Sequence, residues 1–283
     1  MASIGANTWI WTSPLSDERL ASLAPRVRDL GFDVIELPVE NVGDWDPGRA
    51  AELLAEQGLG ASVCAAMPSG RDLLTGEEEV AATQSFLRYC IDSAERIGAP
   101  VVGGPIYSAV GRTWRLEPGE RPRTIQRLTE ALRPIVDYAG DHGVRLALEP
   151  LNRYETSLIT TAEQGLEVVD ALGSPTLGLL LDTYHMNIEE KSPTDAIRLA
   201  GPHLFHVHAS ASDRGAPGAD HVDWPAVAAA LIEIAYPGVL CVEAFTPHET
   251  AIASAAHIWR PVASTQDDLA RDGLEFLRAL TSP

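Results

Sequence analysis

Short apolar runs alternate with longer amphipathic segments along the whole chain. The short runs are rich in aliphatic and β-branched residues, as expected of buried strands, and the segments between them have the spacing of helices. The predicted strands span residues 4–11, 34–39, 61–67, 101–107, 145–151, 177–183, 204–210 and 239–245.

The predicted helices follow the strands one by one. The first is opened by Ser16-Asp-Glu and closes at Gly31. The second starts near Asp46-Pro47, where proline suits the first helical turn. The others span residues 77–97, 121–142, 162–172, 194–199, 224–234 and 266–280.

Eight strand–helix pairs of similar size predict a (β/α)8 TIM barrel, an α/β fold, with residues 1–283 forming a single domain. The alternative is an open doubly wound sheet, which carries a glycine fingerprint after its first strand. The segment Gly5-Ala-Asn-Thr-Trp has no such fingerprint. The pattern therefore favours the barrel, whose active site is built from the loops that follow the strands.

Composition narrows the class of protein. A hydrophobic content of 45% with 22% charged residues is ordinary for a globular chain with a sizeable core. No apolar run is long enough to span a bilayer, and the first residues lack the pattern of a signal peptide. The three cysteines, Cys64, Cys90 and Cys241, are too few and too scattered for a disulfide framework or a thiolate metal site. We therefore expect a cytoplasmic protein without a membrane partner.

The net charge of −19 indicates which kinds of molecule the protein can bind. A nucleic-acid partner requires a basic face for its phosphates, which this composition argues against. We interpret the negative charge as a solvated acidic surface.

Four consecutive predicted strands in the second half of the chain end in side chains that bind metals. These side chains are Glu149, Asp182, His208 and Glu243. Because the carboxyl ends of barrel strands meet at one face, we expect the four groups to lie close together. Three crowded carboxylates repel one another unless a cation neutralises them. Carboxylates with one imidazole suit Mn²⁺, Mg²⁺ or Co²⁺ better than a thiolate-binding ion.

Each of these residues alone has a simpler interpretation. A lone glutamate at a strand end is commonly a surface or salt-bridged residue, Asp182 is also suited to capping the turn after it, and His208 alone fits a core histidine. Their coincidence on four strands favours the metal site. His206 has the same side-chain direction as His208, one layer deeper, and we expect it to be a core residue with its polar groups satisfied.

Further candidates surround the predicted metal site. Three polar side chains on the loops after strands are suited to binding the oxygens of a hydroxyl-rich substrate: Glu155, His185 and Arg214. Four others at strand ends or on the following loops are expected to form pocket walls: Trp11, Cys64, Trp114 and Phe245.

Several motifs resemble a known group of enzymes. The segments Leu148-Glu-Pro-Leu-Asn-Arg-Tyr-Glu155, Leu181-Asp-Thr-Tyr-His-Met-Asn-Ile-Glu-Glu-Lys191 and His206-Val-His-Ala-Ser-Ala-Ser-Asp-Arg-Gly215 resemble the xylose-isomerase-like sugar isomerase/epimerase superfamily. Within it they are most similar to ketose 3-epimerases of the D-tagatose and D-allulose (psicose) type. His221-Val-Asp-Trp224 and Ile258-Trp-Arg-Pro261 support the match, which covers essentially the whole chain.

The resemblance implies specific roles. One divalent ion, Mn²⁺ in the first place and otherwise Co²⁺ or Mg²⁺, is expected on Glu149, Asp182, His208 and Glu243. Glu149 and Glu243 are expected to double as the acid/base pair. The substrate is a small-molecule ketose, whose O1–O3 end Glu155, His185 and Arg214 would hold. The assembly is expected to be a homodimer or a homotetramer. Relatives often carry Cys-Glu-Asn-Asp-Arg where this chain has Ser210-Ala-Ser-Asp-Arg214, which concerns the substrate range more than the metal site.

The hypothesis for the mechanism is epimerisation at C3 through a cis-enediolate that the metal stabilises. One carboxylate removes the C3 proton and the other returns a proton to the opposite face. The alternatives are an aldose–ketose or hydroxypyruvate-type isomerase with the same metal site, a multi-zinc DNA-repair endonuclease and a sugar-binding barrel without catalysis. A free sugar is favoured over a sugar phosphate, because no glycine-rich phosphate cradle follows the last two strands.

Overall fold

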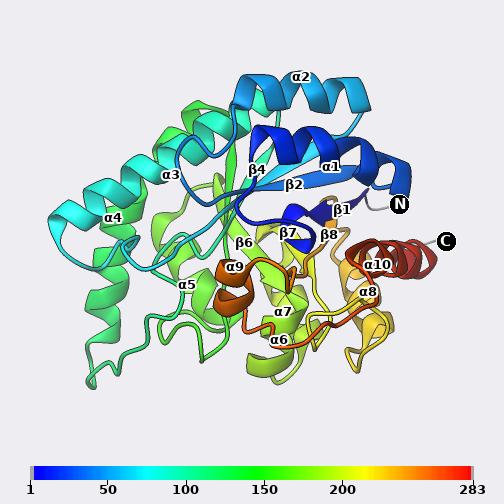
Figure 1. Cartoon of the computed structure of the whole chain (residues 1–283). Coiled ribbons are helices and arrows are strands. Elements are labelled where there is room, and N and C mark those ends of the chain that lie inside the picture. Colours follow the sequence, from blue (N-terminus) through cyan, green and yellow to red (C-terminus); the bar gives the residue numbers. More distant parts are fainter. Residues whose placement is uncertain (1–2, 282–283) are drawn as a thin grey trace.

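Eight parallel strands close into a barrel in the order β1 to β8 in the computed structural model, which describes residues 3–281 (Figure 1). The predicted (β/α)8 barrel is confirmed. The strands are β1 (Ser3–Asn7), β2 (Val34–Val39), β3 (Gly60–Ala65), β4 (Val101–Gly104), β5 (Arg145–Leu148), β6 (Leu177–Asp182), β7 (Leu204–Ala209) and β8 (Val239–Val242).

Most helices surround the barrel on its outside, and two short ones lie at the carboxyl ends of the strands. The helices are α1 (Asp17–Leu30), α2 (Pro47–Gln57), α3 (Glu77–Ile97), α4 (Arg121–Asp141), α5 (Ala162–Leu172), α6 (Thr183–Glu189), α7 (Pro193–Ala200), α8 (Trp224–Glu233), α9 (Thr250–Ala255) and α10 (Gln266–Thr281), with short 3-10 helices at Thr8–Ile10 and Gly201–His203. The last helix, α10, packs against β1, β8 and α8 and so completes the ring. None of the helices within residues 3–281 has the length and hydrophobicity that a membrane span requires.

Local sequence signals explain where the first helices begin and end. The side chain of Ser16 accepts a hydrogen bond from the third residue after it and starts α1, and Asp46 does the same for α2, with Pro47 in the first turn. Gly31 and Gly58 end these helices with φ of 104° and 64°, a conformation that glycine adopts without strain. The predicted starts of both helices are confirmed.

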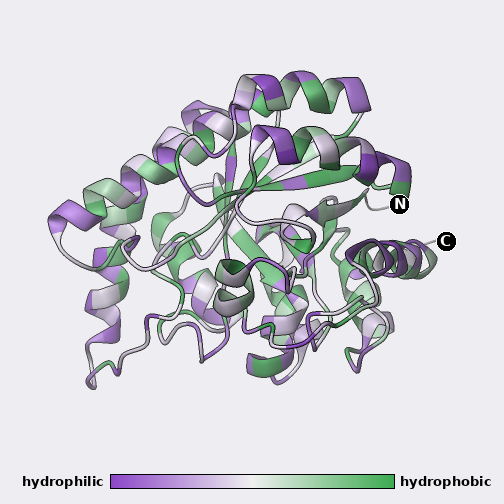
Figure 2. Ribbon diagram, viewed as in Figure 1, coloured by the Kyte–Doolittle hydropathy of each residue, from purple (hydrophilic) through white to green (hydrophobic). Residues whose placement is uncertain are grey.

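Successive side chains along a strand serve two separate packing layers. Leu146 and Leu148 of β5 belong to the main core between barrel and helices, whereas Ala147 between them belongs to a smaller buried cluster with Leu180 and Phe205. This alternation is the period of two that a strand imposes. Figure 2 shows the hydrophobic strands in the middle and hydrophilic positions on the outer faces of the helices.

Most predicted strands extend past their observed carboxyl ends, by three residues or more at 4–11, 101–107, 145–151 and 239–245. Two of them end early for a clear reason. Residues 4–11 do not form one strand, because the side chain of Asn7 accepts a hydrogen bond from the backbone nitrogen of Trp9 at 2.8 Å and starts a 3-10 helix. Residues 101–107 form a strand only as far as Gly104, which has φ of 129°. A Cβ at Gly104 would lie 2.8 Å from the backbone oxygen of Ala65, so the strand leaves the sheet at a position that only glycine fills.

Two helices were not predicted. Helix α6 begins directly after β6, and α9 forms within the long segment after β8. His185, which we expected on a loop, therefore lies on helix α6. Both helices lie on the side of the barrel where the strands end, and so both affect the geometry of the site.

Candidate active site at the carboxyl end of the barrel

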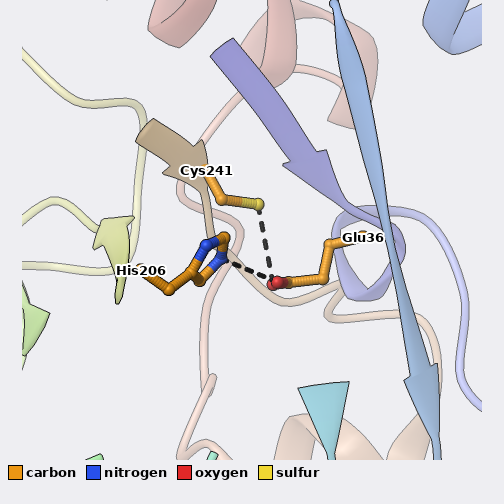
Figure 3. Close-up of side chains that lie close together, drawn as sticks. All are labelled: Glu36, His206 and Cys241. Atoms are coloured by element: carbon orange, nitrogen blue, oxygen red, sulfur yellow. Dashed lines mark hydrogen bonds and ion pairs between the residues drawn. The ribbon is translucent and has the colours of Figure 1, made fainter. Parts of the chain in front are cut away.

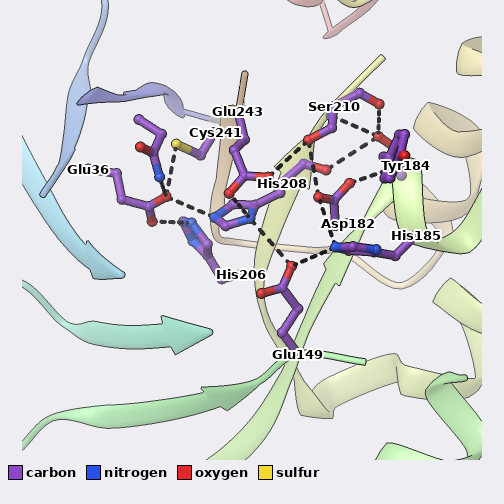
Figure 4. Close-up of polar contacts among 12 residues, drawn as sticks. Glu36, Glu149, Asp182, Tyr184, His185, His206, His208, Ser210, Cys241 and Glu243 are labelled. Atoms are coloured by element: carbon purple, nitrogen blue, oxygen red, sulfur yellow. Dashed lines mark hydrogen bonds and ion pairs between the residues drawn. The ribbon is translucent and has the colours of Figure 1, made fainter. Parts of the chain in front are cut away.

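The four predicted metal-binding side chains lie together at the carboxyl ends of β5 to β8. Glu149 directly follows β5, Asp182 ends β6, His208 lies in β7, and Glu243 directly follows β8. Asp182 and His208 are neighbours in the register of the sheet. All four side chains are buried, so the strands hold them in fixed positions at one point (Figure 4).

The distances among these groups are those of a single centre. Nδ1 of His208 lies 3.2 Å from Oε1 of Glu243 and 3.7 Å from Oε1 of Glu149. One ligand atom each from Glu149, Asp182 and His208 lies within 4.8 Å of the others. Oxygen atoms from three carboxylates and one imidazole nitrogen form a donor set that suits Mn²⁺, Mg²⁺ or Co²⁺.

His208 shows directly that the site fits a cation. Its Nδ1 is buried and has no hydrogen-bond partner, while its Nε2 lies 2.8 Å from Oε1 of Glu36. A carboxylate on the far nitrogen is the usual arrangement for a metal-binding histidine, because it orients the ring. Burial lowers the pKa of His208, but Glu243 and Glu36 outweigh this and hold it well above its usual value. Binding of a cation therefore releases a proton from the ring.

Asp182 has two roles, one for each oxygen. Oδ1 accepts a hydrogen bond from the backbone nitrogen of Tyr184 at 2.7 Å and starts helix α6, while Oδ2 faces the site. Oδ2 accepts hydrogen bonds from Nη1 of Arg214 at 2.8 Å and from Oγ of Ser210 at 3.2 Å. Burial raises the pKa of Asp182, but Arg214 and His185 outweigh it, so the pKa lies below its usual value. The carboxylate is ionised.

Arg214 connects the carboxylates with an aromatic wall. Its Nη1 lies 2.8 Å from both Asp182 Oδ2 and Glu243 Oε2, and its Cζ lies 3.9 Å from the centre of the Tyr184 ring and 5.0 Å from that of Phe245. Its backbone has φ of 62°, a conformation that costs about 1–3 kcal/mol in a non-glycine residue. This strained backbone in the loop after β7 places the buried guanidinium of Arg214 among the acidic groups.

Burial has a strong effect on the carboxyl group of Glu243. Burial raises its pKa to about 8, although His208 and Arg214 both lower it. A carboxyl group with a pKa near neutrality accepts and donates protons efficiently at physiological pH.

Asn152, which the sequence analysis did not single out, organises the two remaining polar candidates. Its backbone nitrogen donates to Nδ1 of His185 at 3.1 Å, so the other ring nitrogen, Nε2, carries the proton. That Nε2 lies 3.7 Å from Glu149 and 3.9 Å from Asp182. The side-chain amide of Asn152 donates to Oε1 of Glu155 at 2.7 Å. His185 thus presents a donor to the site. The sequence did offer one indication of a role for Asn152, because it lies within the motif Leu148–Glu155 that follows β5.

A cavity of about 290 Å³ opens above these groups. Glu149, Glu155, His185, Arg214 and Glu243 line it. Of the four expected wall residues, Cys64 and Phe245 also belong to the lining.

Trp11 and Trp114 do not reach the lining, which corrects the expectation for them. The 3-10 turn after β1 directs Trp11 outward, where its Nε1 donates to Asp267 of α10 at 2.9 Å. The ring of Trp114 lies under the guanidinium of Arg112, 4.1 Å from Cζ, on the segment that leaves β4 early. Trp9 lines the cavity instead.

The two sides of the cavity differ in chemistry. Acidic and basic side chains of the second half of the chain line one side. The other side carries mainly apolar residues from β3, from the segments that follow β1 to β4 and from the α9 segment, with Glu40 and Asn41 as polar groups. Nε1 of Trp9 donates to Glu40 at 3.0 Å, and the Trp9 and Phe245 rings lie 5.6 Å apart. Burial raises the pKa of Glu40, despite hydrogen bonds from Trp9 and Ser13 that lower it.

A buried polar network lies beneath the site and was also missed. Its centre is Glu36 of β2, whose carboxylate lies 2.8 Å from Nε2 of both His206 and His208 (Figures 3 and 4). Nε2 of His206 makes this contact, but its buried Nδ1 has no hydrogen-bond partner, so the expectation of a core residue with satisfied polar groups is met only in part. The signal in the sequence was a single glutamate inside the otherwise apolar strand Val34–Val39.

Comparisons with known proteins agree with this geometry. A family model described as a xylose isomerase-like TIM barrel matches residues 24–280. A probable ketose 3-epimerase from Synechocystis sp. is 34% identical over 277 residues, which cover 97% of this chain and 95% of that protein. A solved structure of L-ribulose 3-epimerase has a TM-score of 0.92 and 31% identity, and the match covers 99% of this chain and 94% of that one. A D-allulose 3-epimerase from Methylomonas sp., solved in complex with D-allulose, has a TM-score of 0.91 and 30% identity over 98% of this chain and 96% of that one.

Proposed function

This chain belongs to the xylose isomerase-like TIM barrel family, and from that premise we propose that it is a metal-dependent ketose 3-epimerase. It is a carbohydrate isomerase that inverts the C3 centre of a ketose. The observation that carries the proposal is the pair Glu149 and Glu243, two buried carboxylates that approach His208 Nδ1 from strands β5 and β8. Ketose 3-epimerases among its relatives cover nearly the whole chain.

The metal centre is part of the proposal. Glu149, Asp182, His208 and Glu243 would hold one divalent ion, which we propose to be Mn²⁺, with Co²⁺ or Mg²⁺ as alternatives. The ion supplies Lewis-acid stabilisation of the negative charge that develops on the sugar oxygens. The bare Nδ1 of His208 supports this assignment.

Glu149 and Glu243 would transfer the protons. Inversion at C3 requires removal of one proton and its return from the opposite face, which two fixed carboxylates on strands β5 and β8 do better than one mobile base. We assign Glu243, which directly follows β8, to one face of the sugar. We assign Glu149 to the opposite face. Acid/base assistance of this kind contributes about 10²–10⁴-fold to the rate.

Three residues would hold the sugar. His185 donates from Nε2, because its Nδ1 accepts from Asn152. Arg214 brings a buried positive charge next to the reacting oxygens, where charge stabilisation is strongest. Glu155, fixed by Asn152, accepts from a sugar hydroxyl.

The substrate we propose is a free ketose of the D-tagatose/D-sorbose, D-fructose/D-allulose or L-ribulose type. Among the described residues that line the cavity are the carboxylates Glu40, Glu149, Glu155 and Glu243. The guanidinium of Arg214 in the same lining is already paired with Asp182 and Glu243. A phosphorylated sugar would bring added negative charge into this acidic cavity, which disfavours it.

A ketose panel with added Mn²⁺, Co²⁺ or Mg²⁺ tests the function. The products are separated by chromatography, and the exchange of sugar protons in D₂O is followed by NMR. A 3-epimerase yields C3 epimers and exchanges the C3 proton, and removal of metal by a chelator stops both. Aldose products would instead assign the isomerase reaction, and binding without exchange would assign a sugar-binding protein.

The assembly and location complete the proposal. We propose a homodimer or homotetramer in the cytoplasm. Light scattering on the purified protein measures the first, and fractionation of the source cells measures the second.

A further inference from the structure

The network beneath the site centres on one carboxylate that touches neither the cavity nor solvent. Glu36 has a relative exposure of 0% and points from β2 into the barrel interior. Its neighbours in the register of the sheet are Asn7 of β1 and Ser62 of β3, and across the barrel lie His206 and His208 of β7 and Cys241 of β8 (Figure 4).

Both oxygens of Glu36 are fully engaged. Oε1 lies 2.9 Å from Nδ2 of Asn7, 2.8 Å from Nε2 of His208 and 3.6 Å from Sγ of Cys241. Oε2 lies 2.9 Å from Oγ of Ser62 and 2.8 Å from Nε2 of His206. A buried carboxylate is tolerable only with such a complement of donors and positive partners.

The contacts of Glu36 argue against a second metal ion beside it. Glu36, His206 and Cys241 bring ligand atoms within 4.8 Å of one another (Figure 3). However, donors from Asn7 and Ser62 already occupy the carboxylate oxygens. Glu36 therefore acts through hydrogen bonds.

The contact with His208 determines what that ring presents to the site. Oε1 of Glu36 already accepts a hydrogen bond from Nδ2 of Asn7, so it acts as an acceptor toward His208 as well, and Nε2 of His208 carries the proton that points at Glu36. A neutral imidazole has one N–H and one lone pair, which leaves the lone pair on Nδ1. That atom faces Glu243 and Glu149.

We propose that Glu36 is a positioning residue that holds His208 in the tautomer whose Nδ1 lone pair faces the metal site, and thereby sets the affinity for the metal. This inference rests on the proposed function, since it requires the metal centre. Glu36 reaches the site from beneath through a strand of the first half of the barrel. It contributes to the centre without touching the substrate.

Calorimetric titration of the metal-free protein with Mn²⁺, in the absence of sugar, tests the proposal. Glu36→Gln keeps the shape of the side chain but removes its charge and its exclusive acceptor role. We expect it to weaken Mn²⁺ binding by about 10–100-fold, the usual effect of losing such a partner. Ser62→Ala is the matched control, because it removes another donor to the same carboxylate and leaves the contact with His208 in place. It should keep the wild-type affinity.

A readout on the wild-type protein keeps the proposal falsifiable even when the Glu36→Gln protein does not fold. Nitrogen-15 NMR of the Mg²⁺-loaded wild-type protein reports which ring nitrogen of His208 carries the proton. We expect a protonated Nε2 and an unprotonated Nδ1. A proton on Nδ1, or a folded Glu36→Gln protein with unchanged affinity, overturns the positioning role. A wild-type protein that binds no Mn²⁺ overturns the proposed metal centre as well, so the two failures are distinct.

Discussion

Asn152 donates a hydrogen bond from its side-chain amide to Oε1 of Glu155 at 2.7 Å, and the two residues follow the same strand. The same amide nitrogen lies 2.9 Å from Nδ1 of His185 on helix α6. Asn152 thus couples two proposed substrate-binding side chains that come from different strands, although it does not line the cavity itself.

Asn152→Ala should therefore impair sugar binding. Both His185 and Glu155 lose a hydrogen bond worth about 0.5–1.5 kcal/mol, which together correspond to a fall of about 10-fold in kcat/KM. Steady-state kinetics should show most of the change in KM. Ser157→Ala, which removes a contact of the same segment to the backbone of Trp114, is the control. Equal effects of the two variants would contradict the role of Asn152.

Glu149→Gln and Glu243→Gln should each abolish turnover. The variants retain a hydrogen-bonding side chain but lose the group that accepts and donates the C3 proton, so we expect a loss of at least about 10²-fold. Exchange of the C3 proton in D₂O, measured by NMR, should disappear with the epimerisation. Glu117→Gln on the exposed segment after β4 should retain full activity. Near-native exchange in either active-site variant would remove that residue from the mechanism.

Glu40 should give the stability of the protein a distinct pH dependence. Because burial raises its pKa in the folded chain above the ordinary value of 4.5, the folded state binds the proton more tightly than the unfolded state. The stabilisation is complete below that ordinary value and is lost as the pH rises through the folded value. The Tm of Glu40→Gln minus that of the wild type should therefore become more positive between about pH 4 and about pH 7.

The difference between variant and wild type cancels the other titrating groups, so this slope belongs to Glu40. Glu117→Gln, an exposed glutamate, provides the baseline. A Tm difference that does not change with pH, or that changes in the opposite direction, would show that burial does not raise the pKa of Glu40. The bonds from Trp9 and Ser13 lower the pKa of Glu40 and are therefore already included in its net upward shift.

Gly178→Ala should destabilise the barrel. A Cβ there would clash with the backbone oxygen of His203 and come within 2.6 Å of the Phe205 ring, so β6 and β7 would have to move apart. Overpacking of this kind costs about 1–3 kcal/mol. Thermal unfolding should show a lower Tm than for Gly76→Ala, since a Cβ at Gly76 meets no atom within 4 Å. Equal Tm values would mean that the strands adapt without cost.

The sequence was sufficient to predict the barrel and the meeting of Glu149, Asp182, His208 and Glu243. The parallel strands of a barrel all end at the same face, so a polar residue at the end of an apolar run is expected to lie at that face. The pairing of Asp182 with His208 does not follow from this rule, because the register of β6 with β7 shifts between Leu179 and Leu180.

Other features depend on contacts that no local pattern specifies. The cavity receives Trp9 and not Trp11 because the side chain of Asn7 ends β1 early. The donors to Glu36 come from other strands, and these lie far away in the sequence. A buried glutamate is visible in the sequence, but its partners become known only once the strands are paired.

The charged side and the apolar side of the cavity come mostly from different strands, so the residues proposed for proton transfer are separate from those that would determine which ketose fits. The groups that we propose to transfer protons and hold the sugar follow strands β5 to β8, whereas Trp9 and Met67 of the apolar wall follow β1 and β3. Mutations in that wall leave the reacting groups in place. Directed evolution toward a new ketose can therefore be confined to a small library at the wall, with the catalytic half of the barrel held constant.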